Sequence, residues 1–378
     1  MMPAVLVFPK IQQGASVMNE CCGVKMTGIG IALPDHVMSN ADVADLLQAR
    51  RATAVFTGRA HKDDPRLVQF DCDPLWIAER TGIKERRVAA SHEATSDFAA
   101  AAVKMAIDEA GIIPDAIDFL LLATVTPDYL ASPPTASIVQ HKVGLPNASA
   151  FDMSVACSSF VAALEVAYCR IRSGCSKAGI VVGADLMTRI ANPNDRSTLP
   201  LFGDAGAACV LEATSLAEDH FGPRNFFSGS DGSRASLIEV PAGGSRRPVS
   251  THDIEDPFIQ PHKLRMNGHE VFKEMVRLLS SKIIPDALAK AGVSLGEVDA
   301  IVFHQANSRM IAPVVEKLGY KGIVPMNIHL FGNTTSASIP LCLYDALKSG
   351  EIKQGMLVLL VAFGGGLTWA AALMRVGL

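Results

Sequence analysis

The 378-residue sequence lacks a strong charge bias, a long apolar run and a recognisable secretion signal. Its formal net charge is only −4, which gives no indication that the protein as a whole binds nucleic acid or a membrane surface. No apolar run approaches the roughly 18 residues that a membrane-spanning helix needs. The short apolar stretch from Val5 to Phe8 has no cationic segment before it, so we expect no secretory signal and a cytoplasmic protein.

Cysteine is also scarce for a chain of this length. None of the eight cysteines forms a C-x-x-C pair or has the spacing of metal ligands, which predicts reduced thiols and no bound metal. The lone Gly28-Ile29-Gly30 lacks the third glycine of a dinucleotide fingerprint and is followed by Pro34, so we expect no nicotinamide or flavin cofactor. The cysteines are Cys21, Cys22, Cys72, Cys157, Cys169, Cys175, Cys209 and Cys342.

What the sequence does contain is an internal repeat. Gly111 and Asp118, which precede an apolar strand, recur 181 positions later as Gly292 and Asp299. Each copy combines a helix that ends at glycine, a short loop and a continuous apolar run. This pattern is typical of a strand that is buried on both faces of a parallel sheet.

A second pair of similar segments lies 176 positions apart. Gly174 and the strand from Ile180 to Val182 match Gly350 and the strand from Met356 to Val358. Helices and strands alternate in both halves, which predicts an α/β fold with helices on both faces of the sheets. We expect a flexible extension over 1–25, an N-terminal half over 26–213 and a C-terminal half over 214–378, with the active site where the halves meet.

Three polar residues fall at corresponding places in these repeats. Cys157 follows a strand and precedes the helix predicted from Ser158 to Arg172, so the helix N-terminus is expected to lower its pKa and favour the thiolate. The second offset relates Cys157 to Asn333, and the first places His304 at the carboxyl end of a strand, where ligands gather in α/β folds. The sequence therefore predicts that Cys157, His304 and Asn333 converge.

Each of these residues also has a purely structural interpretation. A cysteine can be a small buried hydrophobic residue, which we predict for Cys169, Cys209 and Cys342. His304 alone could be a hydrogen-bonded core residue, and Asn333 could be a helix cap. The glycines 364–366 could form a simple turn, although they also allow a backbone N–H to approach a substrate oxygen closely.

Taken together, these motifs resemble the β-ketoacyl-[acyl-carrier-protein] synthase III family. The similarity extends from about Met26 to Leu378. It includes the cysteine after Phe151-Asp152, the segment His304–Asn307, Gly332-Asn333-Thr334 and the Gly364–Gly366 loop before Trp369. The resemblance implies a thiolase-like fold, with two βαβαβαββ halves in five α-β-α-β-α layers, and a homodimer.

The resemblance also implies an acyltransferase that makes carbon–carbon bonds. Cys157 would take an acyl group from an acyl-CoA, with the N–H groups of Cys157 and Gly365 as the oxyanion hole. A malonyl thioester, carried by acyl carrier protein (ACP), would then lose carbon dioxide. The resulting enolate would be stabilised by His304 and Asn333, which can both supply N–H donors. Its attack on the acyl-Cys157 carbonyl would give a 3-oxoacyl-ACP.

The coenzyme A site follows from the same resemblance. Trp76 and Arg80 match the family's adenine-stacking tryptophan and a nearby arginine, and Arg196 matches the arginine on the other face of the adenine. Planar indole and guanidinium groups suit such a sandwich. The alternative is a solvent-facing Trp-Arg pair. Asn307 would contact the pantetheine arm.

The sequence departs from the family pattern at several positions. His269 stands where many members have asparagine at the pantetheine tunnel. The segment 48–73 is longer than usual, and it is either a lid over the coenzyme site or a solvated surface loop. The predicted ACP-docking residues are Lys273, Arg309 and Lys317, although Glu316 replaces a frequent lysine beside them.

Ser132 matches the residue that family members project into the partner subunit's acyl pocket. A phenylalanine at this position restricts members to very short acyl groups. A small residue before Pro133-Pro134 resembles members that take longer chains, so we expect a medium or long acyl-CoA. Alternatively, Ser132 is only a turn residue.

Three other functions can be weighed against this one. A degradative thiolase needs a second cysteine in the C-terminal glycine loop, and residues 363–366 contain none. A closer alternative uses the same Cys-His-Asn set for acyl transfer to an oxygen or nitrogen acceptor, or for condensation in a specialised pathway. A non-enzymatic scaffold would have no use for this set together with an oxyanion loop.

Overall fold

The computed structural model describes residues 22–216, 222–256 and 258–377. Of the predicted extension over 1–25, residues 1–21 lie outside the described part. Strand β1 begins at Gly23, before the boundary predicted at Met26. Among the described residues, no helix combines the length and the apolar character needed to span a bilayer.

Most elements of the first half build one sheet and its helices. In chain order they are β1 (Gly23–Ala32), β2 (His36–Ser39), α1 (Asn40–Phe56), α2 (Pro74–Thr81), β3 (Glu85–Val88), α3 (Thr95–Ala110), β4 (Phe119–Ala123), α4 (Thr135–Val143), β5 (Ser149–Met153), α5 (Ser159–Arg172), β6 (Ala178–Leu186) and β7 (Asp204–Thr214).

The second half supplies the remaining strands and helices. They are β8 (Gly222–Ser230), β9 (Ile238–Glu239), α6 (Thr251–Glu255), β10 (Arg265–Met266), α7 (Gly268–Leu278), α8 (Ile284–Ala291), β11 (Ala300–Phe303), α9 (Ser308–Leu318), α10 (Ile328–Phe331), α11 (Ser338–Lys348), β12 (Leu357–Gly364) and β13 (Thr368–Arg375). One π-helical turn, Leu279–Ile283, joins α7 to α8.

The two main sheets have the same strand order. The first is β1-β7-β6-β4-β5, and the second is β8-β13-β12-β11. The pairs β4–β6 and β11–β12, which correspond to each other, are parallel, and the strands that continue each sheet beyond β6 and β12 are antiparallel. An isolated parallel bridge between Ala300 and Ile323 lies where the first sheet has β5. The second sheet therefore keeps the βαβαβαββ order with its third strand reduced to a single bridge.

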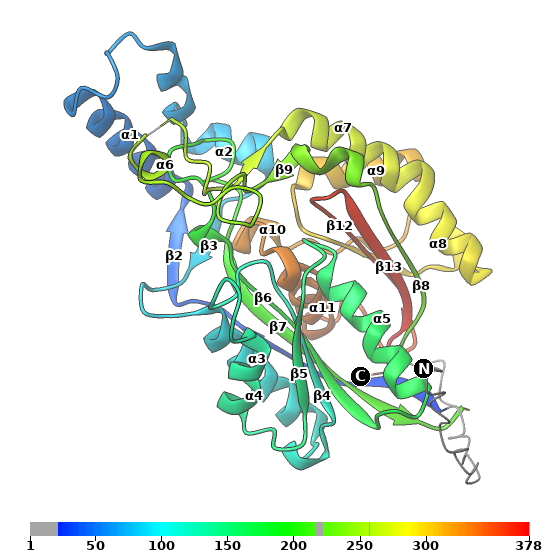
Figure 1. Cartoon of the computed structure of the whole chain (residues 1–378). Helices are drawn as coiled ribbons and strands as arrows, with labels where there is room; N and C mark the ends of the chain where they lie inside the picture. The colour runs from blue at the N-terminus through cyan, green and yellow to red at the C-terminus, as the bar shows by residue number, and fades with distance from the viewer. Residues whose placement is uncertain (1–21, 217–221, 257, 378) are drawn as a thin grey trace, which may run out of the picture.

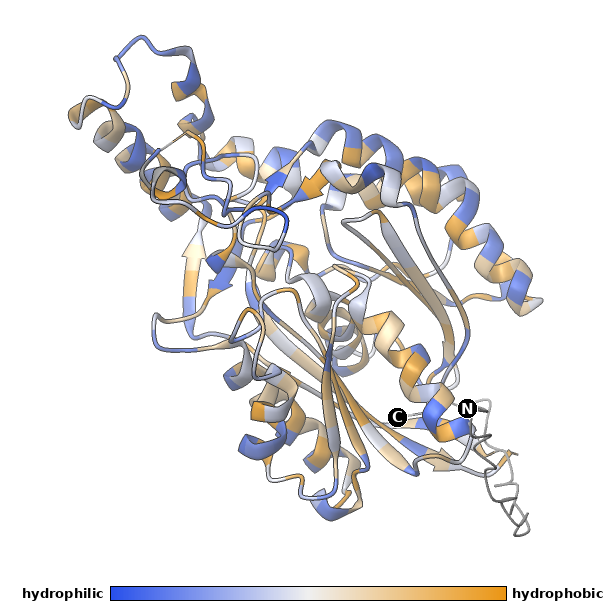
Figure 2. Ribbon diagram, viewed as in Figure 1, coloured by the Kyte–Doolittle hydropathy of each residue, from blue (hydrophilic) through white to orange (hydrophobic). Residues whose placement is uncertain are grey.

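Helices cover both sheets and separate them, which gives the predicted five layers (Figure 1). Helices α3 and α4 pack on the outer face of the first sheet, and α7, α8 and α9 pack on the outer face of the second. Helices α5 and α11 lie between the sheets, and much of α5 is coloured as hydrophobic in Figure 2.

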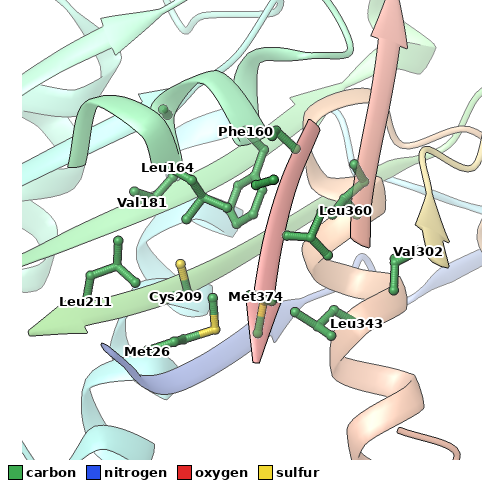
Figure 3. Packing of buried hydrophobic residues seen from close by; sticks show 14 of the residues in the cluster. Met26, Phe160, Leu164, Val181, Cys209, Leu211, Val302, Leu343, Leu360 and Met374 are labelled. Carbon is green, nitrogen blue, oxygen red and sulfur yellow. The ribbon is translucent and has the colours of Figure 1, made fainter. Parts of the chain in front are cut away.

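The largest apolar cluster fills this central layer (Figure 3). It joins Phe160 and Leu164 of α5 and Leu343 of α11 to residues of both sheets, such as Val181 and Leu360. Strands β4, β6 and β12 are buried along their whole length, because helices cover both of their faces. Residues at or just after the carboxyl ends of β4, β6, β11 and β12 line one pocket; they are Val125, Met187, His304 and Gly364.

The repeat found in the sequence is visible in the geometry. Gly111 and Gly292 both end a helix in the left-handed conformation, with φ of 64° and 66°. The strand alignment at the second repeat needs a correction, however. Phe119 pairs with Gly179 and Ala300 pairs with Val358, so Ile180–Val182 correspond to Leu359–Val361 rather than to Met356–Val358. The loop after Gly350 is three residues longer than its counterpart after Gly174, which shifts the strand offset to 179.

Candidate active site

Cys157 lies at the turn that leads from β5 into α5. The helix begins at Ser159 with Ser158 at the cap, so the thiol lies at a helix N-terminus as predicted. Ala156 adopts a left-handed conformation with φ of 49°. The Ser159 hydroxyl accepts the Val155 N–H (2.7 Å) and donates to the Ala156 carbonyl (2.6 Å). These bonds hold the nucleophile turn in one conformation.

The glycine loop after β12 packs directly on this turn. A Cβ added to Gly364 would lie 2.6 Å from the backbone nitrogen of Cys157, so only glycine fits there. The backbone N–H groups of Cys157 and Gly365 both lie close enough to the Cys157 thiol to oppose the rise of its pKa. Two backbone donors from different halves of the chain therefore converge beside the sulfur, which is the arrangement that an oxyanion hole requires.

Burial dominates the acidity of this thiol and raises the pKa of Cys157 to about 12. The Asp185 carboxylate adds to the rise, whereas the N–H groups of Cys157 and Gly365 and the Thr335 hydroxyl oppose it. The predicted lowering of this pKa is therefore wrong for the free enzyme. The thiol does lie at the helix N-terminus, but the loss of water around the thiolate outweighs the nearby donors.

His304 lies at the carboxyl end of β11 and is completely buried against Ser338 and Phe363. Its Nδ1 is 2.6 Å from the Ser338 hydroxyl, and its ring meets the Phe363 ring edge to face at 5.3 Å. Burial lowers the pKa of His304 to about 3, so the imidazole is neutral at physiological pH.

The hydrogen bonds of Ser338 favour the tautomer of His304 that carries its proton on Nε2. The Ser338 oxygen accepts the Gln305 N–H at 3.4 Å, which leaves its own hydrogen free to bond to Nδ1 of His304. Nδ1 is then an acceptor, and Nε2 carries the N–H. His304 can therefore donate a hydrogen bond into the pocket without bearing a charge.

Asn333 is oriented by the turn that follows it. Its Oδ1 accepts the Thr335 N–H at 2.9 Å, which leaves the Nδ2 hydrogens available as donors. Its backbone is bonded to the first half of the chain, with N–H donation to Leu201 O (2.8 Å) and acceptance from Gly203 N–H (3.1 Å). Asn333 therefore presents N–H groups from a loop that is fixed across the two halves.

Two residues that the sequence analysis did not single out shape this turn. Thr335 has φ of 51°, a strained conformation for a β-branched residue, and its hydroxyl is directed toward the Cys157 thiol. Asp185, fully buried at the end of β6, accepts the Ser336 N–H at 3.0 Å and thereby anchors the turn. Asp185 also accepts from Thr124, Val125 and Thr126.

One pocket of about 840 Å³ contains the three predicted catalytic residues. Cys157, His304 and Asn333 line it together with Gly365, so the structure brings together the residues that the repeat predicts to converge. The wall of the same pocket also includes the apolar residues Val125, Met187, Ile190, Phe202, Ile238 and Leu264. The pocket that contains the thiol can therefore take an apolar group.

Trp76, Arg80 and Arg196 line the same pocket. The guanidinium carbons of Arg80 and Arg196 lie 5.7 Å and 5.2 Å from the centre of the Trp76 ring. These are cation–π distances, and three flat groups are thus gathered at one site, as expected for a surface that stacks on a planar base.

Asn307 lies in this pocket, but its side chain already has structural partners. Its Nδ2 donates to Arg80 O (3.1 Å), and its Oδ1 accepts the Arg309 N–H (2.9 Å) and caps α9. Asn307 therefore joins α2 to α9. The predicted contact with a pantetheine arm stays a prediction.

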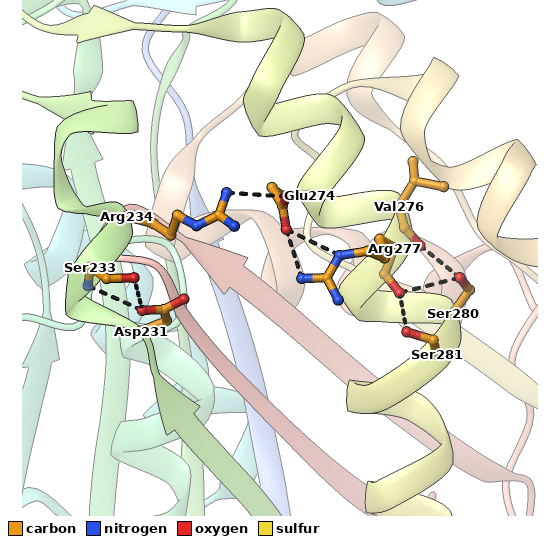
Figure 4. Close-up of polar contacts among 8 residues, drawn as sticks. All are labelled: Asp231, Ser233, Arg234, Glu274, Val276, Arg277, Ser280 and Ser281. Carbon is orange, nitrogen blue, oxygen red and sulfur yellow. Dashed lines mark hydrogen bonds and ion pairs between the residues drawn. The ribbon is translucent and has the colours of Figure 1, made fainter.

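Helix α7 carries His269 into the pocket wall and is tied to the segment after β8. Glu274 of α7 bonds Arg234 at 3.1 Å and Arg277 at 2.7 Å, as Figure 4 shows. The predicted docking residues are all exposed: Lys273 lies on α7, and Arg309 and Lys317 lie on α9, which packs beside it. Arg309 also lines the pocket. Their docking role stays a prediction.

Ser132 lies in the loop between β4 and α4, outside the residues that line the pocket of its own chain. Tyr129 and Leu130 of the same loop are exposed, at 55% and 91%. In the part of the chain that the structure describes, no three His, Cys, Asp or Glu side chains are grouped in a way that could hold a metal ion.

Comparisons with known proteins agree on one family. The family model described as 3-oxoacyl-[acyl-carrier-protein (ACP)] synthase III matches residues 151–232, and that of its C-terminal part matches residues 288–376. A β-ketoacyl-[acyl-carrier-protein] synthase III of Symbiobacterium thermophilum is 38% identical over 355 residues, which cover 94% of this chain and 98% of that protein.

Solved structures give the same result. The 3-oxoacyl-[acyl-carrier-protein] synthase III of Aquifex aeolicus has a TM-score of 0.78 and 35% identity, with 93% of this chain and all of that chain covered. The priming β-ketosynthase of the R1128 polyketide pathway has a TM-score of 0.79 and 29% identity, with 94% of this chain and 97% of that chain covered.

The acidity of Cys157 can be tested by alkylation. Because its raised pKa keeps the thiol protonated, the rate of its modification by iodoacetamide should rise roughly tenfold per pH unit, without a plateau up to about pH 9. Peptide mass spectrometry measures this rate, and the exposed Cys175 controls for the stability of the reagent. A plateau near neutral pH would show that the helix N-terminus prevails over burial.

The tautomer of His304 should depend on Ser338. In Ser338→Ala the donor to Nδ1 is lost, so ¹⁵N NMR of the imidazole should show the Nδ1–H form gaining population. Ser338→Thr keeps the hydroxyl and should keep the Nε2–H form. An unchanged tautomer in Ser338→Ala would exclude Ser338 as the residue that sets it.

Proposed function

Because the chain belongs to the β-ketoacyl-[acyl-carrier-protein] synthase III family, we propose that it condenses an acyl-CoA with malonyl-ACP through an acyl-Cys157 intermediate. The observation that carries this proposal is that one pocket contains Cys157, His304 and Asn333. The same pocket contains the cluster of Trp76, Arg80 and Arg196. The product is a 3-oxoacyl-ACP, and the enzyme is an acyltransferase of the condensing type.

In the first half-reaction the Cys157 sulfur attacks the thioester carbonyl of the acyl-CoA. The new bond joins this sulfur to the acyl carbon, the bond to the coenzyme sulfur breaks, and the proton of Cys157 leaves with free coenzyme A. Negative charge develops on the carbonyl oxygen, and the N–H groups of Cys157 and Gly365 stabilise it. The raised pKa of the free thiol makes the transfer of its proton part of this step.

In the second half-reaction the malonyl thioester loses carbon dioxide. The electron pair of the broken carbon–carbon bond forms an enolate, whose oxygen accepts hydrogen bonds from Nε2–H of His304 and Nδ2–H of Asn333. Because His304 is neutral, it stabilises the enolate without protonating it readily. The enolate carbon attacks the acyl carbonyl, the carbon–sulfur bond breaks, and the Cys157 thiolate takes up a proton.

The proposal includes a homodimer that works in the cytoplasm. A dimer would bring the exposed Tyr129–Ser132 loop against the partner subunit, where Ser132 could border the acyl pocket. The described cysteines are unpaired thiols, which suits a reducing compartment. Ser132 leaves room for an acyl chain of several methylenes, each worth roughly 0.8 kcal/mol when buried.

The two half-reactions can be separated by mutation. Cys157→Ala should abolish acyl loading. His304→Ala or Asn333→Ala should still load but decarboxylate malonyl-ACP about 10²–10³ times more slowly, since one enolate donor is lost. Intact-protein mass spectrometry measures loading, and release of carbon dioxide measures the second step. Wild-type decarboxylation by either mutant would refute the assigned roles, and esters or amides among the products would favour the alternative acceptors.

Chain-length preference tests the role of Ser132. Wild type should load octanoyl- or dodecanoyl-CoA faster than acetyl-CoA, and Ser132→Phe should reverse this order by filling the channel. Ser137→Phe, on α4, provides a control for the mere addition of a phenylalanine nearby. If wild type prefers acetyl-CoA, or if Ser132→Phe leaves the profile unchanged, Ser132 does not border the acyl pocket.

A further inference from the structure

The 48–73 insertion forms hydrogen bonds with both Trp76 and Arg196, two of the three flat groups that are gathered in the pocket. Its last residues form a short bridge from Gln69 to Asp73. The Arg196 N–H donates to Gln69 O (2.8 Å), and its guanidinium Nη1 donates to Asp71 O (2.6 Å). Asp73 caps α2 by accepting the Trp76 N–H at 2.9 Å. One stretch of five residues therefore holds the two groups that would face the base.

A small apolar core makes this stretch rigid. Phe70 and Leu67 are buried, at 0% and 2% exposure, and they pack with Val43, Leu47 and Ile77. Leu199, three residues after Arg196, belongs to the same cluster, and Trp76 packs against it. The position of both stacking residues consequently depends on the packing of the insertion.

Phe258, from the segment between α6 and β10, also packs against this core. The Phe258 ring meets Phe70 edge to face at 6.1 Å, and the Arg66 guanidinium lies 4.0 Å from the centre of the Phe258 ring. Arg51 of α1 bonds Asp71 at 3.0 Å and adds a polar contact to the bridge.

The two alternatives predicted for the insertion were a lid over the coenzyme site and a solvated surface loop. Among the described residues, none from 48 to 73 lines the pocket, so the insertion does not cover it in this structure. In Figure 1 it extends from the body beside α2. Its buried core also distinguishes it from a solvated loop. The insertion contacts Trp76 and Arg196 through its hydrogen bonds and its apolar core without entering the pocket.

We propose that the insertion preorganises Trp76 and Arg196 and so makes the enzyme select donors that carry the nucleotide of coenzyme A over donors that carry pantetheine alone. This inference rests on the proposed function, in which an acyl-CoA delivers the acyl group. A side chain that is already held in place loses less conformational freedom when a base stacks on it. Loosening the insertion should therefore weaken binding of the nucleotide and leave the reaction at Cys157 intact.

The test compares two phenylalanines of the same region. Phe70→Ala removes the centre of the small core, whereas Phe56→Ala changes a side chain that is 92% exposed. Phe70→Ala should raise the KM for octanoyl-CoA about two- to tenfold, as expected when one long side chain loses its preorganisation. Its rate of loading from octanoyl-pantetheine should equal that of wild type. Phe56→Ala should resemble wild type with both donors.

Each outcome of this comparison either supports or overturns the proposed role of the insertion in donor selection. An unchanged ratio of the two donors in Phe70→Ala overturns the inference, and so does an equal loss with both donors, which would mean a general folding defect. Leu67→Ala gives the same comparison if Phe70→Ala does not fold. Failure of wild type to load from any acyl-CoA, acetyl-CoA included, would instead count against the proposed function. Calorimetric titration with free coenzyme A, which needs no catalysis, should show the same loss of affinity.

Discussion

The contact between Gly364 and the backbone of Cys157 is the constraint on which the active site depends. It joins the end of β12 in one half to the nucleophile turn of the other, at a distance that no larger residue allows. Because of this contact, the Gly365 N–H lies beside the sulfur. The central layer of α5 and α11 separates the two sheets, so the proposed oxyanion hole would be a consequence of how the halves pack.

Burial in this layer has opposite effects on the two ionisable residues of the site. It raises the pKa of the Cys157 thiol and lowers that of the His304 imidazole, because in both cases the charged form loses its hydration. The site therefore contains a neutral thiol and a neutral imidazole. Donors that are fixed in a dry pocket stabilise a developing oxyanion or enolate more strongly than water could, since they need no reorganisation. The same burial thus makes the resting thiol weakly acidic and the donors effective.

The sequence was sufficient to predict the fold, and it predicted the convergence of Cys157, His304 and Asn333, because the motifs and the repeat are local patterns. It could not predict the pKa of Cys157, since that depends on how far the opposite half excludes water. The roles of Ser338 and Asp185 were also missed. Ser338 acts through a bond to a residue 34 positions away, and Asp185 acts through one to a residue 151 positions away. A lone acidic residue at the end of the apolar strand β6 was the available signal for Asp185.

The duplication of the chain explains why the catalytic residues and the proposed nucleotide-binding residues lie on different parts of the fold. The repeated halves can place one catalytic group at each strand end, but the repeat provides no surface for a nucleotide far from the sulfur. In the proposed function that surface is formed by α2 and the 190–200 loop, and the insertion contacts both through hydrogen bonds and a separate apolar core. Because this core is distinct from the cluster between the sheets, a change in the insertion can alter donor recognition without moving Cys157, His304 or Asn333. The proposed selectivity for the donor and the chemistry at Cys157 would therefore rest on separate packing units.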